Sequence, residues 1–232
     1  MMNAKDINVM QLDAVASALA DLLPQVTFVG GSTTVLLVDS AGHFGVRKTD
    51  DVDVIIDVAS LIEYHQFSQR LRDLGFREDT DGPVCRWLFD TDVGTIKLDV
   101  MPIDESILGF SNRWYKEAIA EPLEMRLPSG VAIQVVSPVY FIATKFEAFA
   151  GRGKGDYFSH DLEDIVFVLE NRSGLITELM NASEELKSYF SKQAELLLND
   201  DFLNVLPGLV NNPESAKVIE SHLKIMKTWS YI

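Results

Sequence analysis

The chain has 232 residues, a formal net charge of −15 and one cysteine, Cys85. A single cysteine excludes an internal disulfide and a zinc site built from several cysteines. The acidic balance argues against broad, non-specific binding of nucleic acids, which needs a basic surface, but a local basic cluster can still face an RNA substrate. No apolar run reaches about 18 residues and the first residues carry no signal-peptide pattern, so we expect a cytoplasmic protein without a membrane span.

The first part of the chain alternates predicted strands and helices. Apolar spacing predicts helices over residues 8–23, 33–40 and 59–74. Short apolar runs bounded by turn residues predict strands, and these cover residues 25–29, 51–58, 84–89, 95–101 and 132–136.

From Ser137 the pattern becomes helical. Ser137 followed by Pro138 is typical of a helix start, and that helix is expected to reach Gly151. Further helices are predicted over residues 161–171, 175–198 and 200–231, with interruptions at Pro207-Gly208 and from Asn211 to Pro213. We therefore expect an α+β fold, with a catalytic domain over residues 1–136 in which helices flank a mixed β-sheet, followed by a helical domain over residues 137–232.

Three aspartates fall on predicted strands. Asp51 and Asp53 lie two residues apart, so their side chains project from the same face of a strand. Asp99 interrupts an apolar strand, where aspartate is disfavoured. Asp51 and Asp53 could simply lie on an exposed strand face, and Asp99 could be a surface position on an edge strand. Asp104 is the alternative to Asp99 as the third carboxylate. Three such carboxylates nevertheless form the oxygen ligand set that Mg²⁺ prefers.

A glycine turn precedes the aspartate pair. Gly30 and Gly31 followed by Ser32 could serve chain geometry alone, because glycine suits a tight strand-to-helix turn. Before a strand with two carboxylates, the same turn lets the main chain approach a triphosphate and lets the Ser32 hydroxyl donate to a phosphate. The combination predicts a nucleotidyl-transfer site.

This order of motifs resembles the DNA polymerase β-like nucleotidyltransferase superfamily. The resemblance rests on the Gly-Gly-Ser turn, on the pattern Arg47-x-Thr49-x-Asp51-x-Asp53 and on Asp99. A second block is similar to the AbiEii-type branch, which is known for bacterial toxins and abortive phage infection. That block contains Lys145, Glu147, Arg152, Asp161 and Asp164.

The resemblance implies an enzyme that moves a nucleoside monophosphate from an NTP such as ATP to a hydroxyl acceptor. Mg²⁺ or Mn²⁺ is expected on Asp51, Asp53 and Asp99. Lys145 is expected to neutralise the β- and γ-phosphates, and Asp161 either to orient Lys145 or to contact the ribose of the nucleotide. The expected NTP-binding residues are Gly30, Gly31, Ser32, Arg47, Thr49, Lys145 and Arg152.

The resemblance also implies a biological role. The acceptor would be the 3′ end of a tRNA, and the protein would be a toxin with an antitoxin partner. Two alternatives stay open. The acceptor could instead be a small molecule such as a cationic aminoglycoside, or a protein side chain. The chain could also be an inactive nucleotide-binding or interaction module, although its intact carboxylates argue against that.

Overall fold

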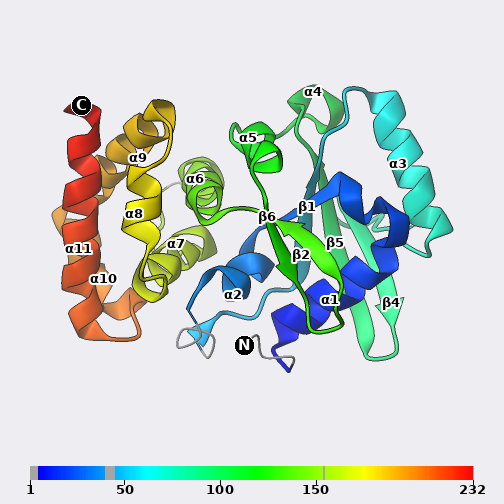
Figure 1. Cartoon of the computed structure of the whole chain (residues 1–232), viewed down its shortest axis with the longest axis horizontal. Coiled ribbons are helices and arrows are strands. Elements are labelled where there is room, and N and C mark those ends of the chain that lie inside the picture. Colours follow the sequence, from blue (N-terminus) through cyan, green and yellow to red (C-terminus); the bar gives the residue numbers. More distant parts are fainter. Residues whose placement is uncertain (1–4, 40–44, 154, 232) are drawn as a thin grey trace. The chain divides into compact units, whose positions relative to one another are not determined.

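The computed structural model describes residues 5–39, 45–153 and 155–231. The chain forms two compact units (Figure 1). The first comprises Met1–Leu36 and Arg47–Ser137, and the second comprises Leu37–Val46 and Pro138–Ile232. The chain therefore leaves the first unit after Leu36, re-enters it at Arg47 and leaves it again after Ser137.

Seven strands form one mixed sheet within the described part of the first unit, in the order β3-β4-β5-β2-β1-β7-β6. Their bounds are β1 Val26–Val29, β2 Asp51–Ile56, β3 Arg77–Glu78, β4 Arg86–Thr91, β5 Gly94–Pro102, β6 Leu123–Arg126 and β7 Ala132–Val135.

The centre of this sheet fixes the relations that matter for function. Strand β2 pairs with β1 in the antiparallel direction and with β5 in the parallel direction. Strands β4 and β5 form an antiparallel hairpin. Val52, Val54 and Ile56 of β2 are buried, and the alternate positions Asp51 and Asp53 remain partly exposed. Asp51 and Asp53 therefore lie on one face of β2 and are less buried than the valines between and after them.

Helices of the first unit cover its sheet (Figure 1). Helix α1 begins after Asp6, whose side chain accepts from the first free main-chain N–H groups, and helix α3 begins in the same way after Ser60. Tyr64 and Phe67 of α3 are buried. The helical segments of this part are α1 Ile7–Leu19, η1 Ala20–Gln25, η2 Gly31–Thr33, α2 Thr34–Leu37, α3 Leu61–Asp73, α4 Glu105–Leu108 and α5 Tyr115–Ala120.

The second unit is helical in its described part. Its core contains fully buried aromatic side chains, among them Phe146, Phe190 and Phe202. Helices α9 and α11 carry apolar stripes at helical spacing, which is why they bury one face each. The segments are α6 Pro138–Ala148, η4 Phe149–Gly153, α7 His160–Asn171, α8 Leu175–Met180, α9 Glu184–Leu197, α10 Asp200–Leu209, α11 Pro213–Lys227 and η5 Thr228–Tyr231.

The α+β class with a mixed sheet and a following helical region is confirmed. The sequence did not predict strands β3 and β6 or helices α4 and α5, which are all short. The helix expected over residues 175–198 is two helices, because α8 ends at Met180 and Ser183 caps α9. No helix within the described residues combines the length and apolar character needed to cross a membrane.

Candidate active site

The glycine turn after β1 brings the main chain against a carboxylate. Gly30 has a φ of +73°, and a Cβ atom placed on it would lie 2.0 Å from Oδ2 of Asp53. Only glycine combines this backbone conformation with so close an approach. The register explains the proximity, because Val29, the residue before Gly30, pairs with Asp53.

Two buried hydroxyls follow this turn. Ser32 and Thr34 are 0% and 1% exposed, and within the described residues neither hydroxyl oxygen has a hydrogen-bond partner. Thr33, between them, donates its hydroxyl to the Gly30 carbonyl at 2.8 Å. Leaving a buried hydroxyl unpaired costs about 1–3 kcal/mol, so orphaned groups beside a glycine turn indicate a place where a ligand supplies the partner.

The three predicted aspartates share one face of the sheet. Asp53 is the register partner of Asp99 across the parallel β2–β5 pair, and Asp51 lies two residues before Asp53. Paired residues in neighbouring strands point to the same side. Three carboxylates therefore form a row, which we call the carboxylate row.

Arg86 at the start of β4 is the counter-charge of this row. Its Nε donates to Asp99 Oδ1 at 2.8 Å, and its Nη2 donates to Asp99 Oδ2 at 2.8 Å and to Asp51 Oδ2 at 2.9 Å. Hydrogen bonds to Asp99 and the charges of Asp99 and Asp51 raise the pKa of Arg86 against the opposing effect of burial. No local sequence pattern singled out this residue.

Hairpin geometry could have found Arg86. Thr91 pairs with Gly94 at the tip of the β4–β5 hairpin, and counting back from the tip places Arg86 opposite Asp99. Neighbouring Cys85 is buried as expected, and burial together with the Asp99 charge raises the pKa of its thiol to about 12. Such a thiol is not a nucleophile near neutral pH.

The same side chains bear on whether a metal ion could bind here. Across residues 5–39, 45–153 and 155–231, no three His, Cys, Asp or Glu side chains converge into a ligand set. Arg86 Nη2 instead binds one oxygen each of Asp51 and Asp99, two members of the carboxylate row. The donor chemistry of the row nevertheless fits a hard divalent cation, since it offers carboxylate oxygens alone.

The two predicted residues before β2 have different surroundings. Thr49 is 3% exposed, and its hydroxyl lies 3.1 Å from the main-chain oxygen of Asp51 and 3.2 Å from Oδ1 of Asn8. Arg47 donates from Nη1 to the Lys48 carbonyl at 3.3 Å. Thr49 is thus engaged within the protein itself.

Residues of the second block form a separate cluster in the helical unit. Lys145 of α6 contacts Asp161 Oδ1 at 3.1 Å and Asp164 Oδ2 at 2.7 Å, and all three side chains are nearly completely buried. Arg152, which is mostly exposed, donates to both Asp161 oxygens at 2.7 and 2.8 Å. We call these four residues the Lys145 cluster.

The ionisation of Asp161 follows from this arrangement. Burial raises its pKa, but hydrogen bonds from Arg152 and the charge of Lys145 outweigh burial, so the pKa lies below the ordinary value. Within the helical unit, the structure therefore joins Lys145, Arg152, Asp161 and Asp164, all of which belong to the second block.

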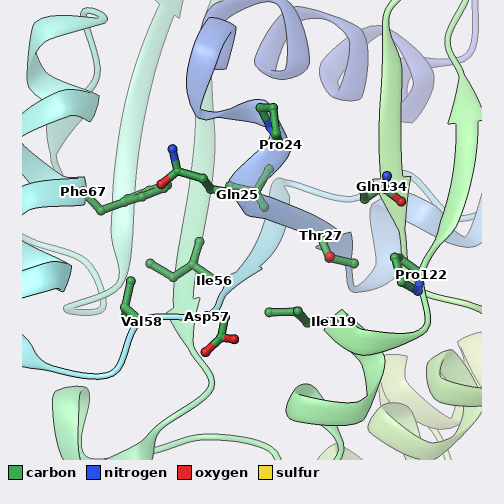
Figure 2. Close-up of a pocket in the computed structure, with 11 residues that line it drawn as sticks. Pro24, Gln25, Thr27, Ile56, Asp57, Val58, Phe67, Ile119, Pro122 and Gln134 are labelled. Carbon is green, nitrogen blue, oxygen red and sulfur yellow. The ribbon is translucent and has the colours of Figure 1, made fainter.

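A pocket of about 350 Å³ lies at the opposite end of β1 and β2 from the carboxylate row (Figure 2). Val26 and Ile56, which pair in register, contribute to it together with Thr27, Asp57 and Gln134. No residue of the carboxylate row or of the glycine turn lines it. One carboxylate, amides and apolar side chains fit no single ligand class, and we assign this pocket no substrate.

Comparison with protein families gives a match over most of the chain. A family model described as "Nucleotidyl transferase AbiEii toxin, Type IV TA system" matches residues 18–224. No curated protein sequence matches the chain.

One solved structure shares the fold at low sequence identity, and two others align with lower scores. An antigenic nucleotidyltransferase-like protein from Paracoccidioides brasiliensis aligns with a TM-score of 0.56 and 18% identity, covering 91% of this chain and 97% of that one. The antibiotic-resistance factor ANT(2'')-Ia aligns with a TM-score of 0.43 and 18% sequence identity, and the alignment covers 81% of this chain and 94% of that one. A STING-associated CdnE c-di-GMP synthase from Capnocytophaga granulosa aligns with a TM-score of 0.32 and 12% sequence identity, and the alignment covers 97% of this chain and 83% of that one. The last two scores are too low to carry an argument.

Proposed function

Because the chain belongs to the AbiEii nucleotidyltransferase toxin family of type IV toxin–antitoxin systems, we propose that it transfers a nucleoside monophosphate from an NTP to the 3′ hydroxyl of a tRNA. Family membership makes it an NTP-using transferase and implies an antitoxin partner. The divalent cation, the acceptor and the residue roles below are our proposal. Both substrates are cytoplasmic, and we place the reaction there.

One observation carries the assignment of the reaction to the first unit. The Asp53 carboxylate lies against Gly30, and the unpartnered Ser32 hydroxyl is buried two residues further along the chain. A triphosphate bound at the turn would supply the missing partner of Ser32 and would lie beside the carboxylate row. Thr34 has an equivalent orphaned hydroxyl, and we add it to the predicted NTP-binding residues Gly30, Gly31 and Ser32.

Asp51, Asp53 and Asp99 would hold Mg²⁺ or Mn²⁺. When bound, the cation supplies charge to stabilise the entering and leaving oxygens of an in-line displacement. Arg86 binds Asp51 and Asp99 through one nitrogen, Nη2. We propose that Arg86 keeps this row assembled and compensates its charge until the substrate arrives.

The reaction needs an oriented acceptor and a proton acceptor. The acceptor oxygen attacks the α-phosphorus, the bond to the bridging oxygen of the β-phosphate breaks and pyrophosphate leaves. We assign the acceptor side to Asp99, because it lies one strand further from the glycine turn than Asp53. Its carboxylate, oriented by Arg86, would take the hydroxyl proton.

We assign phosphate contacts to the Lys145 cluster as well. Lys145 and Arg152 both bind Asp161, so one buried carboxylate orients two cations of the kinds that recognise phosphate. In this proposal Lys145 binds the NTP β- and γ-phosphates, and Asp161 keeps its ammonium in place.

The test is a transfer assay with each of the four α-labelled NTPs, Mg²⁺ or Mn²⁺, and purified tRNA. We expect label on the tRNA and release of pyrophosphate. Asp53→Asn should abolish transfer because it removes a charge from the row, and Asp92→Asn, at the tip of the β4–β5 hairpin, is the matched control. Label on a small hydroxyl compound or on a protein, with none on tRNA, would overturn the acceptor; no label on any of them would overturn the activity.

A further inference from the structure

Thr49 and Asn8 form a buried hydrogen-bonded pair separated by 41 positions in the sequence. The Thr49 N–H donates to Asn8 Oδ1 at 3.0 Å, and the Thr49 hydroxyl lies 3.2 Å from the same oxygen. Asn8 is 1% exposed and Thr49 is 3% exposed. Buried polar pairs of this kind keep one geometry because separating them leaves unpaired groups.

The other end of the Asn8 amide holds the same segment. Asn8 Nδ2 donates to the main-chain oxygen of Arg47 at 2.9 Å. The amide orientation is unambiguous, since the Thr49 N–H can only donate and the Arg47 carbonyl can only accept. The Asn8 main-chain N–H is itself bonded to Asp6 at 2.9 Å, which fixes the side chain to the start of α1.

These bonds act where the chain re-enters the first unit. Arg47 is the first residue of that unit after the segment Leu37–Val46, which belongs to the helical unit. Two residues after Thr49, β2 begins at Asp51, whose main-chain oxygen lies 3.1 Å from the Thr49 hydroxyl. The pair therefore fastens the chain to α1 immediately before the carboxylate row.

We propose that Asn8 and Thr49 are positioning residues that set the place of Asp51 and Asp53, an inference that rests on the proposed nucleotidyl transfer. Thr49 then acts through the main chain of Asp51 and does not contact the NTP, in contrast to its predicted role. We call the pair the Asn8–Thr49 anchor.

The physical reason is the sensitivity of transfer to position. A misplacement of reacting groups by about 1 Å costs on the order of a hundredfold in rate. Loss of the anchor moves the carboxylates without removing any group that touches substrate. The effect should therefore fall on turnover, whereas loss of a direct NTP contact raises KM.

The first experiment compares Thr49→Val, Thr49→Ser, Asn8→Ala and the double variant Asn8→Ala/Thr49→Val in steady-state transfer. We expect Thr49→Val and Asn8→Ala each to lower kcat by about ten- to a hundredfold, with KM for the NTP within roughly twofold. Thr49→Ser retains the hydroxyl and should recover most of the activity. The double variant should be no slower than the worse single variant, because both remove one network.

Ser129→Ala is the matched control. It removes the hydrogen bond that the Ser129 hydroxyl donates to another α1 residue, Asp13, and so tests whether any loosening of α1 has the same effect. It should leave kcat unchanged. A raised KM with normal kcat in Thr49→Val would overturn the anchor and return Thr49 to the NTP site. Independent, multiplying effects of the two single changes would also overturn it.

A second measurement separates the anchor from the proposed reaction. Hydrogen exchange of the amides of residues 49–53 needs no substrate, and we expect Asn8→Ala to accelerate it while Ser129→Ala does not. If the wild-type protein transfers no nucleotide but this acceleration is seen, the proposed function fails and the anchor stands. Unchanged exchange in Asn8→Ala overturns the anchor, whatever the enzyme does.

Discussion

At the scale of single residues, the carboxylate row and the glycine turn were predictable because each is a local pattern. Asp51 and Asp53 share a face by strand periodicity, and Gly30 precedes them in a recognisable order. Arg86 and Asn8 were not predictable in the same way. Their partners lie 13 and 41 positions away, so finding them requires the hairpin register for Arg86 and the packing of α1 for Asn8.

Gly30 gives the sharpest test of the turn. Gly30→Ala should abolish transfer and lower the free energy of unfolding by about 1–3 kcal/mol, since its Cβ would collide with Asp53 as well as strain the backbone. Gly109→Ala is the matched control, with a φ of +81° but nothing within 4 Å of the added Cβ. Calorimetry measures the free energy of unfolding of the two variants, and the transfer assay measures their activity. Equal, small losses in the two variants would mean that the approach to Asp53 is unimportant.

Arg86 should reveal how the carboxylate row is stabilised. Arg86→Met leaves Asp51 and Asp99 without their counter-charge, and we expect a loss of about 2 kcal/mol, below the 3–5 kcal/mol typical of fully buried pairs because these side chains are partly exposed. Mn²⁺ should restore more stability to Arg86→Met than it adds to the wild type, because the cation replaces the missing charge.

The control for this experiment is Arg70→Met. Arg70 pairs with Asp21 at an exposed position, where an ion pair contributes about 0–1 kcal/mol. Its unfolding should be nearly unchanged, and Mn²⁺ should stabilise it by the same amount as the wild type. If Mn²⁺ stabilised Arg86→Met no more than Arg70→Met, the carboxylate row would not be a cation site.

At the scale of elements, long periodic segments were predictable and short ones were not. Helix α3 and strand β2 lie close to their predicted ranges because burial of one face imposes a clear period. Strand β3 has two residues, and β6 is mostly exposed, so neither has an apolar pattern. Their existence depends on pairing with β4 and β7, which tertiary structure alone decides.

The Lys145 cluster joins α6 and α7 and makes the helical unit sensitive to acid. The pKa of Asp161 is lower in the folded chain than in the unfolded chain, so its contribution to stability is present above the unfolded value and is lost as pH falls through the folded value. Lys145→Met removes one cause of the lowered pKa. We expect the variant to unfold at higher pH than the wild type in an acid titration followed by circular dichroism.

Lys217→Met serves as the control for acid unfolding. Lys217 pairs with Glu214 on the surface of α11, and such a pair is largely screened by solvent. Its acid midpoint should match that of the wild type. Identical midpoints for Lys145→Met and the wild type would show that Lys145 does not control the ionisation of Asp161.

At the scale of the whole molecule, the sequence indicated a strand-containing part followed by a helical part. It did not indicate that Leu37–Val46 belongs with the helices. This segment has no periodic apolar pattern, so the unit to which it belongs depends on the residues that it contacts in the folded chain. The Asp39 N–H donates to the Asn171 carbonyl, and Arg172 donates to the Leu37 carbonyl. Neither bond can be predicted from the local sequence.

The net charge of −15 leads to the last prediction. Proteins that hold nucleic acid mainly through phosphates lose affinity steeply with salt, and random RNA competes for them. A chain with 35 acidic and 20 basic residues repels a polyanion over most of its surface, so its acceptor must be held at a few local groups. We therefore expect excess random-sequence RNA to leave nucleotide transfer to tRNA almost unchanged, and the rate to fall only modestly up to about 0.15 M salt. Strong inhibition by random RNA, with a steep salt dependence, would instead reveal an extended basic groove and contradict acceptor binding at a few local contacts.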